Sequence, residues 1–224
     1  IETEDGAVNM ERTCSICGKT ETARIPDPCI GDKYCAGSAF DDMVSADSWA
    51  HEGIDYCVLF GLMSGVGNDL FDPDGMTTRA MLVSILYRMA GEPDVSELPE
   101  TPFEDVGPDA WYADAVRWAY ANEVAAGMDD THFAPDDRLT RAQLVTMLYR
   151  AYGPEKGVRP RPIGGYTDWN TVPEWAYPAA TWAVSMGLLY GTSSTQLSPN
   201  AGANRAQLAA FMMRTCELQS ELDA

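Results

Sequence analysis

The chain has 224 residues and is strongly acidic, with 34 Asp and Glu residues against 15 Lys and Arg residues and a formal net charge of −19. This balance argues against nucleic acid as a partner, because nucleic-acid binding requires a basic face, and against attachment to anionic lipid. No stretch reaches the roughly 18 consecutive apolar residues that membrane insertion needs, while the length supports a sizeable core.

Residues 1–39 differ from the rest because they contain four closely spaced cysteines. The spacing is C-x2-C-x11-C-x5-C, formed by Cys14, Cys17, Cys29 and Cys35. Four thiolates in this order could hold a structural zinc ion tetrahedrally. The alternative is disulfide bonds, which are favoured if the protein lies outside the cell. Both interpretations stay open, and no other cofactor is expected. Cys57 is predicted to be a small buried residue, and a bridge from Cys57 to Cys216 is a further option.

The remainder of the chain consists of three copies of one unit. Tryptophans recur at the same point of each copy, every 62 to 64 residues, as Trp49, Trp111 and Trp175. An aromatic-x-Asp opening, a glycine, a proline and an arginine keep the same register. We place the repeats at residues 40–90, 103–152 and 166–217. A lone unit of about 50 residues would bury little surface, so the three should fold together.

A first helix is predicted between the tryptophan and the glycine of each repeat. Apolar residues recur there at i, i+3, i+4 and i+8, the pattern of one buried stripe. The stripes are Ile54, Cys57, Val58 and Leu62, then Val116, Ala119, Tyr120 and Val124, then Ala180, Ala183, Val184 and Leu188. The glycines that follow, Gly65, Gly127 and Gly191, are expected to end these helices in the left-handed conformation.

A second helix follows a proline-containing turn in each repeat. It opens at Thr78, Thr140 or Asn204, whose side chains can cap the free backbone N–H groups. Gln143 and Gln207 complete a capping box, which repeat one lacks. The apolar stripes are Leu82, Ile85, Leu86 and Met89, then Leu144, Met147, Leu148 and Ala151, then Leu208, Phe211, Met212 and Thr215. Six helices in three hairpins result.

An arginine stands just inside the start of each second helix, as Arg79, Arg141 and Arg205. A cation is unfavourable there, because the helix N-terminus already carries partial positive charge. The pattern therefore predicts an anionic group beside each arginine, with free helix N–H groups adding to the positive site. The arginines at the other end of these helices, Arg88, Arg150 and Arg214, are favourable with the dipole and need no functional explanation.

These motifs together resemble the S-layer homology (SLH) domain. The resemblance covers residues 40–217 and is carried in repeat two by Phe103-Glu104-Asp105, Trp111 and Leu139-Thr140-Arg141-Ala142-Gln143. It implies a mainly α fold, with three helix-hairpin repeats in a pseudo-threefold, three-lobed arrangement around a central helical bundle. It also implies an extracellular protein, in the cell wall or S-layer of a bacterium of Gram-positive type. Members of the family bind secondary cell-wall polysaccharide non-covalently, in well-studied cases through a pyruvylated amino sugar.

The resemblance and the helix ends together nominate twelve carbohydrate-binding residues in grooves between repeats. They are Asp42, Trp49, Gly65, Arg79, Asp105, Trp111, Gly127, Arg141, Asp168, Trp175, Gly191 and Arg205. A guanidinium matches a carboxylate, tryptophan offers a platform for a sugar ring, and aspartate accepts from sugar hydroxyls. The alternatives are that the tryptophans belong to the core, that the aspartates brace loops or cap helices, and that Arg and Asp pair structurally.

The three grooves should be unequal. Repeat two keeps the pattern best, so Arg141 is expected to matter most for binding, and repeat three departs most, with Tyr166, Pro178 and Asn204. We expect an anchoring module that is not an enzyme, with the polysaccharide and neighbouring surface-layer proteins as partners. The alternative is a protein-interaction or lattice module without glycan binding. A glycoside-acting enzyme is the least favoured option, since no catalytic constellation stands out.

Overall fold

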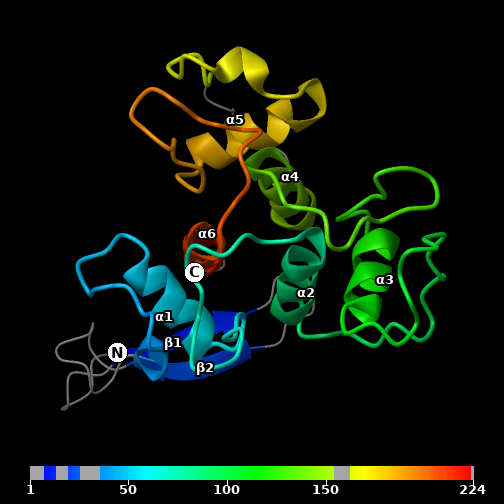
Figure 1. Cartoon of the computed structure of the whole chain (residues 1–224), viewed down its shortest axis with the longest axis horizontal. Helices are drawn as coiled ribbons and strands as arrows, with labels where there is room; N and C mark the ends of the chain where they lie inside the picture. The colour runs from blue at the N-terminus through cyan, green and yellow to red at the C-terminus, as the bar shows by residue number, and fades with distance from the viewer. Residues whose placement is uncertain (1–7, 14–19, 26–35, 154–161, 223–224) are drawn as a thin grey trace. The chain divides into compact units, whose positions relative to one another are not determined.

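The computed structural model describes residues 8–13, 20–25, 36–153 and 162–222 (Figure 1). Two strands, β1 (Val8–Thr13) and β2 (Thr20–Ile25), pair antiparallel. The α-helices are α1 (His51–Leu59), α2 (Arg79–Met89), α3 (Ala113–Ala121), α4 (Arg141–Tyr152), α5 (Tyr177–Ser185) and α6 (Arg205–Leu222). Short 3-10 turns are η1 (Ala36–Ala39), η2 (Trp169–Thr171) and η3 (Glu174–Ala176). The described chain is therefore mainly α, as predicted.

The four cysteines of the N-terminal segment, Cys14, Cys17, Cys29 and Cys35, lie outside the described residues, so zinc and disulfides both stay predictions.

The second helices begin where the capping pattern predicts. The Thr140 side chain accepts from the backbone N–H of Gln143, and the Gln143 side chain accepts from that of Thr140. Asn204 and Gln207 exchange the same two bonds. In repeat one the Thr78 hydroxyl accepts from the Met81 N–H, and methionine has no acceptor to return the bond.

The predicted stripes are buried with a few exceptions. In the second helices Ala151 is only half-buried, while the other stripe residues are buried. In the first helices Val58 and Val184 are half-buried and Tyr120 is 37% exposed. These helices are shorter than predicted, and they bury aromatic residues two positions before those sites, namely Tyr56, Trp118 and Trp182. The buried face of each first helix is therefore wider than one stripe.

Contacts between residues divide the chain into two compact units. The first unit comprises Ile1–Gly75, Met89–Gly91 and Asn204–Ala224, and the second comprises Met76–Arg88 and Glu92–Ala203. In the first unit α1 packs against α6. Gly53 allows the close approach, since a Cβ there would lie 2.8 Å from the Ala210 Cα. Cys57 is fully buried in this contact, and no disulfide joins Cys57 to Cys216.

In the second unit α4 packs against α5, as Figure 1 shows. The Tyr149 and Trp182 rings meet across this contact with centroids 5.5 Å apart, and Tyr87 and Trp118 meet in the same way between α2 and α3 at 5.9 Å. In each case the second helix of one repeat contacts the first helix of the next, just as α6 contacts α1. In the second unit, the two helices of repeat two, α3 and α4, therefore do not pack as the predicted hairpin. The loop between the two helices of a repeat is long enough to let them part, and apolar stripes do not specify which helix they face.

Three segments join in a closed ring of backbone hydrogen bonds in the second unit. The Leu139 N–H donates to the Thr77 carbonyl, the Ala203 N–H to the Leu139 carbonyl and the Thr77 N–H to the Ala203 carbonyl, at 2.9, 2.9 and 3.1 Å. These residues precede the caps of α2, α4 and α6. The ring is what a pseudo-threefold arrangement requires of these segments, while the three-lobed body around a central bundle stays a prediction.

The glycines of the repeats have a different role from the predicted one. Gly65, Gly127 and Gly191 do not adopt positive φ. The left-handed residues lie two positions after the ends of α1, α3 and α5, and they are Gly61, Glu123 and Gly187, with φ of 64°, 58° and 69°. Each of the three glycines instead lies against the opening aromatic residue of its own repeat, Phe40, Phe103 or Tyr166. A side chain there would collide with that ring.

Replacing Gly127 with alanine is expected to destabilise the fold by about 1–3 kcal/mol, because the new Cβ overpacks a tight site. It would lie 2.6 Å from the Phe103 ring and 2.8 Å from the His132 carbonyl. Thermal unfolding measures the effect. Gly107→Ala is the control, since nothing lies within 4 Å of a Cβ at Gly107. Equal melting temperatures for the two variants would contradict the assignment.

Candidate functional site

Arg79 binds the loop of repeat two. Its Nε donates to the Phe133 carbonyl at 2.8 Å, and Nη2 donates to the Ala126 carbonyl at 2.7 Å. The guanidinium carbon lies 4.6 Å from the centre of the Phe133 ring, and the residue is only 3% exposed. The cation predicted to await an anion is thus held by two neutral oxygens and an aromatic face.

The same pair of hydrogen bonds to backbone carbonyls recurs for the other two arginines. In the second unit Arg141 donates from Nε to the Leu197 carbonyl at 3.1 Å and from Nη2 to the Tyr190 carbonyl. In the first unit Arg205 donates from Nε to the Phe71 carbonyl at 2.7 Å and from Nη2 to the Ser64 carbonyl at 2.6 Å. Each repeat therefore inserts its arginine into the next repeat, and the third returns to the first. We call these three arrangements the arginine clamps.

The N–H groups that open the second helices are also occupied. The Arg79 and Ala80 N–H groups donate to the carbonyls of Asp137 and Pro135 in the next repeat. The Arg141 and Ala142 N–H groups likewise donate to the carbonyls of Ala201 and Pro199. The Arg205 and Ala206 N–H groups donate to the carbonyls of Gly75 and Pro73. The expectation that free N–H groups at these positions add to an anion site is therefore wrong. They dock one repeat onto the proline turn of another.

The aspartates brace the loops that the arginines enter. Asp105 accepts from the backbone N–H groups of Phe133 and Ala134 at 2.8 and 2.7 Å. The equivalent pairs are Asp42 with Phe71 and Asp72, and Asp168 with Leu197 and Ser198. One residue of each braced pair has positive φ, namely Asp72, Ala134 and Ser198. These bonds lower the pKa of Asp168, the N–H of Leu197 being the largest cause. The bracing role considered from the sequence is thus confirmed, and sugar contact by these residues stays a prediction.

The repeat tryptophans are surface residues. Trp49, Trp111 and Trp175 are 62%, 65% and 55% exposed, so the alternative that they belong to the core is wrong. An exposed aromatic ring therefore recurs at the same point of each repeat. These rings are available as platforms for a ligand.

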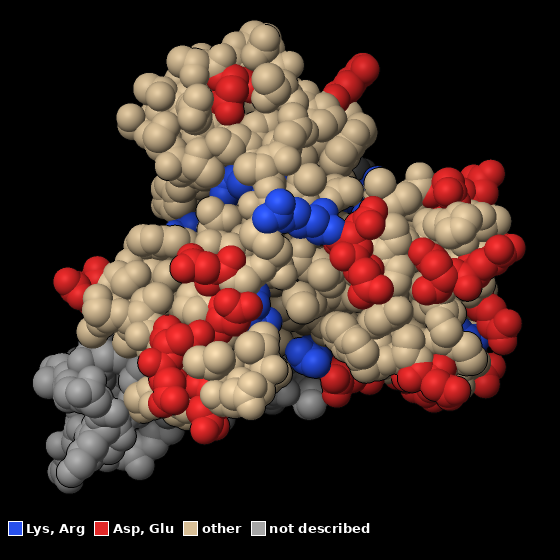
Figure 2. Space-filling view, in the orientation of Figure 1, with Lys and Arg blue, Asp and Glu red and all other residues tan. Residues whose placement is uncertain are grey.

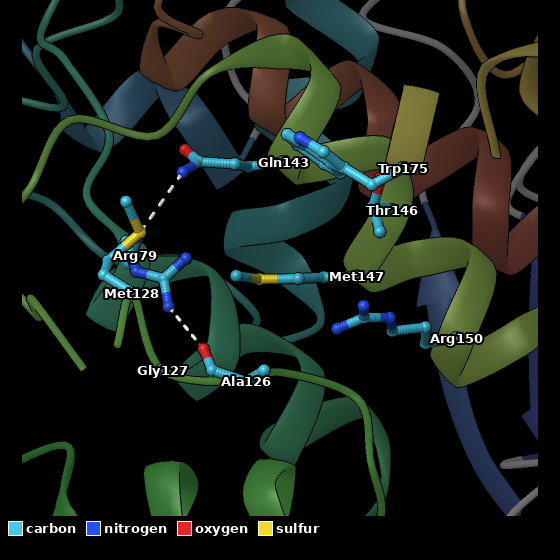
Figure 3. A pocket seen from close by; sticks show the side chains of 9 residues that line it. All are labelled: Arg79, Ala126, Gly127, Met128, Gln143, Thr146, Met147, Arg150 and Trp175. Carbon is cyan, nitrogen blue, oxygen red and sulfur yellow. Dashed lines mark hydrogen bonds between the residues drawn. The ribbon is translucent and has the colours of Figure 1, made fainter. Parts of the chain in front are cut away.

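A pocket of about 260 Å³ in the second unit brings three of the nominated residues together, one from each repeat (Figure 3). They are Arg79 from α2, Gly127 from the loop after α3 and Trp175 from η3. The remaining lining consists of Ala126, Met128, Gln143, Thr146, Met147 and Arg150. We call this the Arg79 pocket. The other nominated residues do not line it.

The Arg79 pocket presents two cations and no carboxylate. The Arg150 side chain is exposed, and in the view of Figure 3 Met147 lies between the two guanidinium groups. Burial lowers the pKa of Arg79, and repulsion from Arg150 lowers it further, while Asp137 and Asp105 oppose the shift. On the displayed face of the molecule acidic side chains are widespread and basic ones few (Figure 2). A concave site with two guanidinium groups is therefore an exception to the charge of the chain.

Sequence reasoning missed most of the α4 lining. Gln143, Met147 and Arg150 stand at i, i+4 and i+7, a spacing that places them on one helix face. From the sequence, helix capping accounts for Gln143 and the helix dipole accounts for Arg150, so neither residue is predicted to line a site. The spacing was visible, but only the structure shows that this face borders the loop of Gly127 and the η3 turn of Trp175.

Among the described residues, no group of three or more His, Cys, Asp and Glu side chains is placed to hold a metal ion. None of the helices in the described ranges is both long and apolar enough to span a membrane.

Comparison with known proteins identifies the repeats. The model of the S-layer homology domain matches residues 39–80, 102–145 and 165–209. The chain is 30% identical over 189 residues to the surface-layer 125 kDa protein of Lysinibacillus sphaericus, covering 81% of the chain and 15% of that protein. It is 26% identical to the S-layer protein sap of Bacillus anthracis, covering 88% of the chain and 23% of the relative. It is also 26% identical to an amylopullulanase of Thermoanaerobacterium thermosulfurigenes, covering 74% of the chain and 9% of that protein. The chain thus spans less than a quarter of each of these relatives, and its three matched segments show that it belongs to the S-layer homology domain family.

Proposed function

We propose that the chain anchors a surface protein to the bacterial cell wall by binding an acidic sugar of a secondary cell-wall polysaccharide in the Arg79 pocket. The observation that carries the proposal is the meeting of two guanidinium groups and an exposed tryptophan in one concave site. Surface-layer names among the relatives support a location outside the cell, in the wall or S-layer.

The charge of the pocket favours an anionic sugar. Arg79 and Arg150 repel each other, so an anion between them would be stabilised by both. Arg150 has a planar fork of donors that matches a carboxylate. Two N–H groups of Arg79 already donate to carbonyl oxygens. We therefore assign Arg150 to direct contact with the sugar carboxylate, and Arg79 to long-range electrostatic attraction of it.

The apolar part of the pocket favours a sugar over a free inorganic anion. Trp175 offers a ring face, and Met128 and Met147 supply further apolar surface. A pyruvyl ketal on an amino sugar presents both a carboxylate and a methyl group, which suits this mixture. A volume of about 260 Å³ lies just below the usual range of about 300–1,000 Å³ for ligand pockets, so one sugar residue is the fitting occupant.

A lattice module without glycan binding is the alternative that the surface-layer relatives favour. Co-sedimentation with purified wall sacculi, before and after extraction of the secondary polymer, separates the two. The anchor proposal expects binding that disappears with the polymer and returns when the extracted polymer competes in solution. Binding that persists on stripped sacculi, or self-association that accounts for all sedimentation, would overturn it.

A further inference from the structure

A second pocket in the second unit occupies equivalent positions of the repeat. Its volume is about 270 Å³, and it is lined by Ser84, Tyr87, Arg88, Glu92, Trp111, Asp114 and Ala115. Ser84, Arg88 and Trp111 stand where the Arg79 pocket has Thr146, Arg150 and Trp175. We call it the Ser84 pocket. It repeats the combination of a helix face and a tryptophan, with Trp111 65% exposed.

The charge of the Ser84 pocket is opposite to that of the Arg79 pocket. Glu92 and Asp114 line it together with one cation, Arg88, whereas the Arg79 pocket has two cations and no acid. In the sequence, the positions of Glu92 and Asp114 are held in the next repeat by Pro154 and Pro178. Both carboxylates are therefore missing from the equivalent positions of the Arg79 pocket.

The pKa of Tyr87, which also lines the pocket, is shifted in the direction that nearby negative charge produces. Burial raises the pKa of Tyr87, and the carboxylates of Asp114, Glu92 and Asp94 raise it further. The Tyr87 hydroxyl donates to the Pro93 carbonyl at 2.8 Å, which ties it to the segment that carries Glu92. Glu92 and Asp114 therefore place negative charge in the same pocket as Trp111.

The pocket also borders a buried hydroxyl without a partner. Ser84 is 6% exposed, and its Oγ makes no hydrogen bond within the described part of the chain. Leaving a buried hydroxyl unpaired costs free energy, so such a group is unusual unless a ligand or water satisfies it. The equivalent Thr146 hydroxyl donates to the Ala142 carbonyl at 2.8 Å and has no such need.

We propose that the Ser84 pocket binds a second, non-acidic sugar residue and prefers one that carries a free amino group. The proposal rests on the proposed function, because it takes the bound polymer to be a glycan. Glu92 and Asp114 accept hydrogen bonds from the ammonium group and a neighbouring hydroxyl, and Trp111 covers the sugar ring. Ser84 Oγ supplies a further hydrogen bond to the ligand. The two pockets would then read two chemically different residues of the same polymer.

The test is titration of the whole chain with methyl glucosaminide, methyl glucoside and methyl glucuronide at about pH 6, where the amine is protonated. Binding is followed by Trp fluorescence and by NMR shifts of the Trp111 indole. The amino sugar should bind about tenfold more tightly than the neutral one, as expected for charge-assisted bonds, and the acidic one more weakly still. The pair Glu92→Gln and Asp114→Asn should remove the preference. Glu97→Gln should not, since Glu97 is an exposed acid five residues after Glu92 that does not line the pocket.

Equal binding of the amino and neutral sugars would overturn the proposal, as would an unchanged preference in the Glu92 and Asp114 variants. Displacement of the amino sugar by equimolar calcium would also overturn it, since the pocket would then be a cation site. Sacculus binding separates this proposal from the proposed function. If wall binding depends on Arg150 while the glucosaminide does not bind, only the second pocket is wrong.

Discussion

Arg150→Gln is expected to lower the affinity of the chain for its wall polymer by at least about tenfold while leaving the melting temperature unchanged. Hydrogen bonds to a charged group contribute about 1.5–3 kcal/mol, and about 1.4 kcal/mol is a factor of ten in a dissociation constant. Arg150 is exposed in the last turn of α4, so glutamine keeps the helix and removes one of the two cations of the Arg79 pocket. Titration with solubilised polymer measures the effect.

The control variant removes the same positive charge at a position outside the Arg79 pocket. Arg138→Gln alters an exposed arginine that does not line the Arg79 pocket, and it should leave the affinity unchanged. Trp175→Ala should weaken binding as Arg150→Gln does, because it removes the apolar platform without touching the clamp of Arg79. Affinity that falls equally for Arg138 and Arg150 would mean that only the overall charge matters. Affinity that is unaffected by either pocket variant would place the glycan elsewhere, for example at the grooves of Arg141 or Arg205.

The sequence could predict what depends on local pattern. The caps at Thr140 and Asn204, the turn at the prolines and the burial of the α2, α4 and α6 stripes all follow from residues within a few positions of one another. The family was also visible, because order and spacing of many residues repeat along the chain. These features do not depend on which repeat touches which.

The sequence could not predict what depends on contacts between repeats. Arg79 looked like a cation without an anion, because its partners, the carbonyls of Phe133 and Ala126, are backbone groups about fifty residues away that every sequence contains. The same limit applies to Gly127, where only glycine fits because a Cβ would collide with the Phe103 ring. It applies again to Arg150, which shares a pocket with a tryptophan of the following repeat. Backbone partners and inter-repeat packing leave no residue-type signal.

Arg79→Ala is expected to destabilise the fold by about 3 kcal/mol, since it removes two charge-assisted hydrogen bonds and leaves the carbonyls of Phe133 and Ala126 without their donor. For a chain of this size that corresponds to a fall in melting temperature of about 6–12 °C. Arg79→Lys should lie between, because an ammonium group on a flexible stem cannot reproduce the fork that reaches both oxygens. Chemical denaturation and thermal melting both measure the change.

The expected cost at Arg79 decides how the clamp arginines can be used in binding studies. Substituting Arg79, Arg141 and Arg205 together by alanine would open the contact of every repeat with the next, so loss of wall binding in that variant would report unfolding as readily as loss of a ligand contact. Arg79→Met separates the two roles, because it keeps most of the buried volume and still leaves both carbonyls unpaired, so it should destabilise nearly as much as alanine. A stable Arg79→Met protein would show that the clamp is dispensable for folding. Its guanidinium would then have to be explained by the ligand, with Arg79 in place of Arg150 as the direct contact.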